Sequence, residues 1–191
     1  MNETIRMINE RRAVRKYKPV AVSDELINQL LDAARMAPSA MNGQPWRFYI
    51  VTEKELIDLL DQKIKAVASR MFRMAHGTEF FNAPNPIFHG APVVIFITAD
   101  RKNEWASLDV GMCAENLMLA ARALGLDTCP VGLGKFAEQT SVYGCLGIPD
   151  EHQLLISVAV GYGDENPPVH PRKTDNAVFV KYEHVAGLLN Y

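Results

Sequence analysis

Residues 92–124 restrict the fold more than any other part of the chain. The run from Pro92 to Thr98 has apolar side chains at odd and even positions alike, which is typical of a central strand buried on both faces. Residues 105–124 have apolar side chains almost all round a helix, which is typical of a helix in a core or a subunit interface. Together the two patterns predict a layered domain in which helices cover a sheet.

Helices and strands alternate along the rest of the chain. Ser23 is a good N-cap for a helix that Pro38 ends, and Thr52 and Glu55 have the spacing of a capping box. Gly125 is the expected stop of the long helix. We expect further helices at 2–11 and 136–145, strands at 48–51, 128–131 and 153–160, and an irregular lid at 76–91.

This order of elements predicts an α+β fold, a mixed sheet with helices packed around it, and leaves the strand order open. With 191 residues the chain is expected to form one domain, 1–191, that buries roughly 70% of its unfolded surface.

Charge and hydropathy exclude several classes of protein. The net charge of −2 argues against general nucleic-acid binding. The longest apolar runs, such as residues 93–97, are far shorter than the roughly 20 residues of a membrane helix. The N-terminus has no basic start followed by an apolar core, so no secretory signal is expected and the predicted location is the cytoplasm.

The side chains that hydrolases and metal enzymes use lack the necessary spacing. The three cysteines lie far apart without a Cys-x-x-Cys pair, so we expect buried or semi-buried thiols rather than a disulfide framework. The five scattered histidines form no metal-ligand pattern, and neither a Ser-His-Asp arrangement nor a Walker loop is present. No metal is expected, and Gly161-x-Gly163 alone is not a dinucleotide fingerprint.

A local concentration of cations near the start of the chain suggests a phosphate-bearing ligand. The segment reads Arg11-Arg12-Ala13-Val14-Arg15-Lys16-Tyr17. An arginine presents a rigid fork of donors that matches phosphate oxygens, and each such contact contributes about 1.5–3 kcal/mol. The alternative interpretation is a set of solvated basic residues at a helix end, where the dipole favours them.

A second segment is rich in amide and hydroxyl side chains held between prolines. It reads Pro38-Ser39-Ala40-Met41-Asn42-Gly43-Gln44-Pro45-Trp46 and follows a predicted helix. Such a loop offers hydrogen-bond donors and acceptors on a stiff backbone, which suits the edge of a heterocycle. A capped turn between a helix and a strand would explain the prolines but not the density of amides.

Together these segments resemble the signature of the FMN-dependent nitroreductase family. The stretch from Asp109 to Leu126 is similar to that family too, as is Val160-Gly161-Tyr162-Gly163 followed by Pro171-Arg172-Lys173, so the resemblance covers essentially the whole chain. It implies a mainly antiparallel sheet surrounded by helices. It also implies an intertwined homodimer with FMN at the interface.

The resemblance assigns site residues by position. Those matching the segment that holds the FMN phosphate and the pyrimidine edge of the flavin are Arg11, Arg12, Ala13 and Arg15. Those matching a loop that approaches the flavin, typically from the partner chain, are Pro38, Ser39, Ala40, Asn42 and Gln44. Gly132, Leu133 and Gly134 match the stretch along the ring near N5, Arg172 and Lys173 match basic phosphate contacts, and Asn82 matches a ring-edge contact.

The activity that the resemblance implies is ping-pong hydride transfer. NADH or NADPH passes hydride to N5 of FMN and leaves, and a nitroaromatic, a quinone or another electron-poor small molecule is then reduced. No protein side chain is expected to be catalytic itself, because the cofactor carries the chemistry. Arg15 is expected to stabilise the negative charge of reduced FMN near N1.

Departures from the family pattern leave the substrate open. Ala13 stands where serine is common, Val131–Gly134 lacks the acidic residue that larger bacterial enzymes carry beside N5, and the chain is shorter than those enzymes. Alternatives within the fold are reductive dehalogenation, azoline oxidation and flavin fragmentation. Alternatives from other classes are a flavin-binding or storage protein without turnover, and a structural domain without a cofactor.

Overall fold

The computed structural model describes residues 2–72 and 79–180. Within them lies a sheet of four strands in the order β1-β2-β4-β3, formed by β1 (Arg47–Val51), β2 (Val93–Asp100), β3 (Asp127–Val131) and β4 (His152–Gly161). Neighbouring strands are antiparallel, and a single parallel bridge joins Ala13 to Thr128 of β3. The predicted α+β class and the central position of β2 are confirmed.

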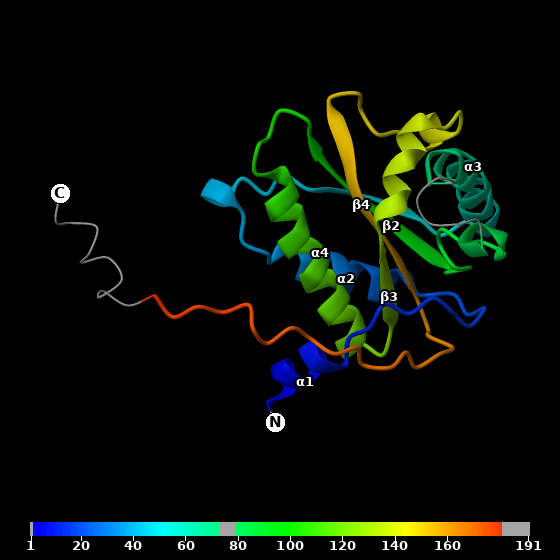
Figure 1. Cartoon of the computed structure of the whole chain (residues 1–191). Helices are drawn as coiled ribbons and strands as arrows, with labels where there is room; N and C mark the ends of the chain where they lie inside the picture. The colour runs from blue at the N-terminus through cyan, green and yellow to red at the C-terminus, as the bar shows by residue number, and fades with distance from the viewer. Residues whose placement is uncertain (1, 73–78, 181–191) are drawn as a thin grey trace.

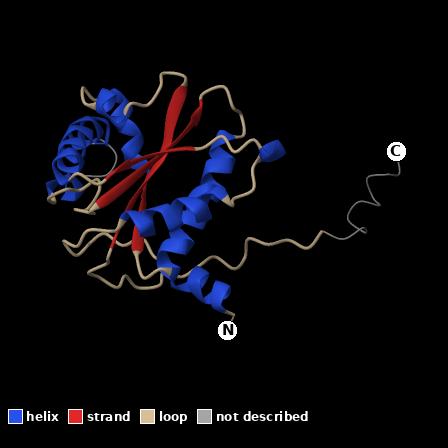
Figure 2. Ribbon diagram, turned by 180° about the vertical axis from the view of Figure 1, so that it is seen from behind, coloured by secondary structure: helices blue, strands red, loops and turns tan. Residues whose placement is uncertain are grey.

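Helices cover both faces of this sheet (Figures 1 and 2). In the described part of the chain they are α1 (Glu3–Glu10), α2 (Asp24–Arg35), α3 (Lys54–Phe72) and α4 (Ala106–Ala123). α2 and α4 pack on one face, α3 packs on the other, and α1 lies against α4. Four short 3₁₀ segments lie in the connections of the described chain: η1 (Ala40–Asn42), η2 (Glu79–Asn82), and η3 (Gly132–Gln139) and η4 (Tyr143–Leu146), which both lie between β3 and β4. No helix among the described residues is long and apolar enough to cross a membrane.

Local sequence signals set most helix boundaries. The Ser23 hydroxyl accepts a hydrogen bond from the Leu26 N–H at 3.3 Å, and Gly125 follows α4 with a left-handed φ of +77°. The start of α3 differs by one residue from the prediction. Ile57 N donates to the carbonyl oxygen of Glu53, so Glu53 rather than Thr52 directly precedes the helix.

The predicted helix over residues 136–145 is replaced by η3 and η4. Thr140 separates the two segments, because its backbone is extended with ψ at 153°. Its hydroxyl donates to the Ala137 carbonyl at 2.8 Å. A threonine side chain that bonds to nearby backbone competes with helix continuation, which the apolar spacing of this region does not reveal.

The sheet separates two hydrophobic clusters. One lies between the sheet and helices α2 and α4, and the other lies between the sheet and α3 with η3. Residues 93–99 of β2 are all buried and contribute alternately to both clusters. The register between β2 and β4 shifts at Ile97 and Thr98, where Thr98 Oγ1 lies 3.1 Å from Nδ1 of the buried His152.

The start of α4 carries large apolar side chains that are not buried. Val110, Cys113, Leu117 and Ala121 are buried in the core, whereas Leu108 in the first turn and Trp105, which directly precedes the helix, are each 58% exposed. The first turn of α4 therefore presents apolar surface that the described part of this chain does not cover.

Candidate functional site

The cationic segment begins at the C-terminal end of α1 and then runs alongside β3. Val14 N donates to the Thr128 carbonyl at 3.0 Å, and the Tyr17 hydroxyl donates to the Val14 carbonyl at 2.7 Å. Val14 is 2% exposed, so its burial fixes the residues on either side. Arg11 caps α1, and its Nε lies 3.1 Å from Oε1 of Glu115 on α4.

Arg15 lines a small cavity at the end of β3. The cavity has a volume of about 150 Å³ and is lined by Arg15, Ile87, His89, Cys129, Pro130, Val131, Gly132 and Leu133. The structure thus brings Arg15 together with Gly132 and Leu133. Burial raises the pKa of the Cys129 thiol, although the Arg15 charge opposes this, and a raised pKa disfavours the thiolate form.

The two glycines after β3 have different roles. A Cβ at Gly132 would meet no atom within 4 Å, so this backbone is open to close approach by a flat ring. A Cβ at Gly134 would lie 1.9 Å from Oγ of Ser157 on β4. Gly134 therefore lets the start of η3 pack tightly on the sheet, which holds the Gly132 backbone in place.

The loop 38–44 is held by hydrogen bonds and lies away from the Arg15 cavity in this chain. Ser39 Oγ accepts from Gln44 N at 3.0 Å, and the buried Asp109 at the start of α4 accepts from Ala40 N at 3.1 Å. Met41, Asn42 and Gln44 have φ values of 52°, 53° and 43°, a strained backbone that is common at functional sites. Figures 1 and 2 place η1 away from β3, and no residue of this loop lines the Arg15 cavity.

These features agree with the comparisons with known proteins. A family model described as the nitroreductase family matches residues 8–162. The chain belongs to the nitroreductase family. A crystal structure of a nitroreductase with bound FMN from Desulfitobacterium hafniense DCB-2 superposes with a TM-score of 0.86 and is 30% identical, covering 95% of this chain and all of that one. An FMN-dependent nitroreductase from Clostridium difficile R20291 superposes with a TM-score of 0.78 at 28% identity, covering 94% of this chain and 99% of that one.

The names of the relatives refer to more than one reaction. The 4-nitrobenzoate reductase of Pseudomonas putida is 28% identical over 95% of this nitroreductase-family chain and 94% of its own. The iodotyrosine deiodinase of Thermotoga neapolitana is 27% identical over 92% of this chain and 95% of its own.

The remaining predicted residues of this nitroreductase-family chain do not line the Arg15 cavity. Arg12 donates through Nη1 to the Arg11 carbonyl at 2.7 Å. Arg172 and Lys173 lie on an exposed C-terminal arm that leaves the body of the molecule (Figure 1). Asn82 ends η2 and is exposed. Residues 76–78 of the predicted lid lie outside the described residues, and 79–91 form η2 and a series of turns.

Two residues that the sequence interpretation missed shape this site. His89 lines the cavity beside Arg15, and Asp61 of α3 is 2% exposed and accepts hydrogen bonds from the N–H groups of Ile87 and Phe88 at 3.1 and 2.7 Å. A carboxylate within the apolar stripe of a predicted helix is the one signal that could have revealed Asp61. His89 had no such signal, because it lies in a loop without periodicity.

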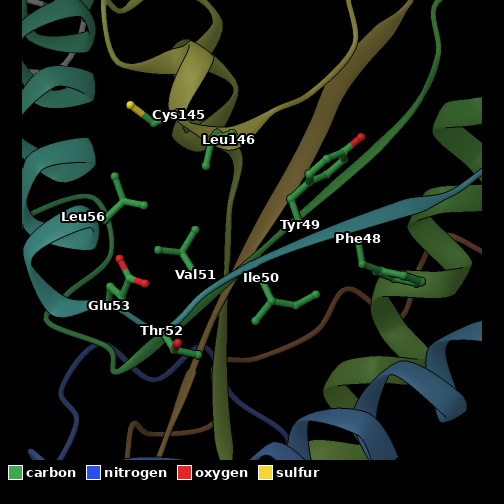
Figure 3. A pocket seen from close by; sticks show the side chains of 9 residues that line it. All are labelled: Phe48, Tyr49, Ile50, Val51, Thr52, Glu53, Leu56, Cys145 and Leu146. Atoms are coloured by element: carbon green, nitrogen blue, oxygen red, sulfur yellow. The ribbon is translucent and has the colours of Figure 1, made fainter.

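A separate hollow of about 350 Å³ lies beside the edge strand β1, and Figure 3 shows the side chains that line it. They come from β1, the start of α3 and η4, and include the carboxylate of Glu53 and the exposed thiol of Cys145. The lining contains no lysine or arginine. It therefore lacks the charge that a phosphate-bearing cofactor needs, and the Arg15 cavity is the better candidate despite its smaller volume.

Proposed function

We propose that this chain is an FMN-dependent oxidoreductase that uses NADH or NADPH to reduce nitroaromatics, quinones or similar electron-poor acceptors. The observation that carries the proposal is the shared cavity of Arg15 and the open Gly132 backbone in a nitroreductase fold. The names of the relatives, including putative NAD(P)H nitroreductases, support the class of reaction and the electron donor. A cytoplasmic location is part of the proposal.

The residues present fit FMN. When bound, FMN supplies a ring that accepts and donates hydride. The Gly132–Leu133 backbone would lie along that ring, and the fixed cation of Arg15 would stabilise negative charge at its pyrimidine edge. Arg11 and Arg12, with Arg172 and Lys173, would hold the phosphate, and the backbone at Ala13 is tied to Thr128 by the bridge beside β3.

A homodimer is part of this proposal. Ligand pockets usually have volumes of about 300–1,000 Å³, so a cavity of about 150 Å³ is only part of a site. The loop that carries Pro38, Ser39, Ala40, Asn42 and Gln44 lies outside the cavity in its own chain, and a partner's copy would complete it. The exposed arm, with Val169, Val178 and Phe179 more than two-thirds exposed, would gain burial by wrapping a second chain.

Exchanging Leu108 for glutamate should weaken the dimer. The side chain is exposed in the monomer, so the fold should be retained, while a charge in the proposed interface is costly. Sedimentation is expected to show a dimer for the unaltered chain and a shift towards monomer for Leu108→Glu, with weaker FMN binding. Leu59→Glu, on the exposed side of α3, is the control. A monomeric unaltered chain would contradict the proposed dimer.

The experiment that tests the proposed function is the visible absorption spectrum of the purified protein, followed by anaerobic addition of NADH and then NADPH. We expect a yellow protein that either nucleotide bleaches, and reoxidation by a nitroaromatic or a quinone. A colourless protein that takes up no FMN would refute the flavin site. A yellow protein that neither nucleotide reduces would favour a storage role.

Reductive dehalogenation is a second candidate, because a relative named iodotyrosine deiodinase matches 92% of the chain. Iodide release from an iodinated phenol by the reduced protein, faster than nitroaromatic reduction, would favour it over the first.

Replacing Arg15 by alanine is expected to weaken FMN binding by about 10- to 100-fold, because a charge-assisted hydrogen bond contributes roughly 1.5–3 kcal/mol. Fluorescence titration of FMN measures the change. Lys16→Ala is the matched control, since Lys16 is a neighbouring exposed cation outside the cavity lining. Equal FMN affinity and turnover in Arg15→Ala and the unaltered protein would remove Arg15 from the site.

A further inference from the structure

The turn that carries His89 has an unusual backbone. Asn85, His89 and Gly90 have φ values of +47°, +58° and +69°. His89 N donates to the Asn85 carbonyl at 2.8 Å, and Ala91 N donates to the Phe88 carbonyl at 3.0 Å. A histidine in the left-handed region is uncommon, and such conformations persist where the surroundings impose them and tend to occur at functional sites.

Buried contacts hold His89 in this conformation. The two residues before it, Ile87 and Phe88, are fully buried and donate their N–H groups to the Asp61 carboxylate. The Phe88 ring also packs edge-to-face on Phe96 of β2, with ring centroids 5.7 Å apart. The turn that carries His89 is therefore attached to α3 and to the central strand, so the fold fixes the backbone position of His89.

In this position His89 lies at the same cavity as Arg15. Both residues line the cavity that includes Gly132 and Leu133. Burial and then the Arg15 charge lower the pKa of His89 to about 4, although Glu165 opposes this. The imidazole is thus uncharged at neutral pH, with one nitrogen as a donor and the other as an acceptor.

We propose that His89 contacts the flavin ring directly and hydrogen-bonds its pyrimidine edge beside Arg15. This inference rests on the proposed function. The pyrimidine edge of a flavin alternates carbonyl oxygens with an N–H group, so it needs acceptors as well as donors. A guanidinium supplies donors only, whereas an uncharged imidazole supplies either. Arg15 then provides charge, and His89 provides a hydrogen bond without a second cation.

Substitution by glycine tests the contact without straining the fold, because glycine readily adopts the φ of His89. The matched control is Asn85→Gly, which makes the same change at a left-handed residue of the same turn that does not line the cavity. We expect His89→Gly to bind FMN about five- to tenfold more weakly in a fluorescence titration, as for the loss of one hydrogen bond. Its midpoint of thermal unfolding without FMN should be unchanged or higher.

A third variant and the possible outcomes separate the alternatives. His89→Asn tolerates the left-handed backbone and keeps a donor and an acceptor, so its FMN affinity should lie between those of His89→Gly and the unaltered chain. Equal FMN affinity in His89→Gly and the unaltered chain would overturn the inference and leave the proposed function intact. Equal weakening in Asn85→Gly would assign the effect to the turn and also overturn it. If the unaltered chain binds no FMN, the inference and the proposed function both fail.

Discussion

Replacing Gly134 by alanine is expected to lower the free energy of unfolding by about 2–3 kcal/mol and to weaken FMN binding. The new Cβ would lie 1.9 Å from Oγ and 2.9 Å from Cβ of Ser157. Ser157 is fully buried and donates to the Val131 carbonyl at 3.0 Å, so it has no free space into which to move. Relief requires η3 to shift away from the sheet, which displaces the Gly132 backbone beside the cavity.

Urea denaturation with and without FMN measures both effects. Gly132→Ala is the control for stability, because a Cβ there meets no atom within 4 Å, and we expect a change within about 0.5 kcal/mol. Ser157→Ala in the Gly134→Ala background removes the closest atom and should recover part of the stability. If Gly134→Ala were as stable as the unaltered chain, η3 would not be packed on β4 as the structure has it.

Replacing Asp61 by alanine is expected to lower the free energy of unfolding by about 2–4 kcal/mol at pH 5. The buried N–H groups of Ile87 and Phe88 would lose their acceptor, and each unsatisfied buried donor costs about 1–3 kcal/mol. Asp61→Asn keeps an acceptor oxygen of the same shape and is expected to be much closer to the unaltered protein. Equal losses in the two variants would show that the carboxylate is not the anchor of the turn.

The pH dependence of stability distinguishes these variants further. Burial raises the pKa of Asp61 from 3.8 to about 6, in spite of the two N–H groups donated to it. The folded chain then binds this proton more tightly than the unfolded chain. The contribution of Asp61 to the free energy of unfolding therefore falls by roughly 3 kcal/mol as pH rises from about 4 to about 6. The lowered pKa of His89 acts in the opposite direction, so the quantity to measure is the difference in stability between the unaltered chain and Asp61→Asn.

Much of the fold was predictable because its signals are local. Ser23, Gly125 and the apolar runs act within a few residues of where they stand, and the elements they predict are present. The strand order was not predictable, because β2 pairs with β1 and with β4 across more than 40 residues of chain, and apolar patterning does not name a partner. The prediction of one helix over residues 136–145 was wrong, because the Thr140 hydroxyl interrupts a pattern that otherwise indicates a helix.

The candidate site was predictable where one stretch of chain carries its own chemistry. Arg15 and Gly132 meet because the segment after α1 runs beside β3, and their residue types alone were informative. Asp61 and His89 become relevant only when α3, the turn at 85–91 and β3 come together. The loop 38–44 carries the expected amides, but their proposed target lies on another chain, so its position in one chain does not show its role.

The uniform burial of β2 means that apolar patterning alone does not specify how this strand is aligned with its neighbours. In most half-buried strands polar and apolar residues alternate. A shift in register by one residue is then unfavourable, because it would put polar side chains into the core. From Val93 to Ile97 such a slip exchanges one apolar residue for another and carries little penalty of this kind. Thr98 and His152 are both buried, and their side chains meet in the observed alignment. Because a buried polar group without a partner is costly, this contact favours the observed alignment of β2 and β4 over one shifted by a residue.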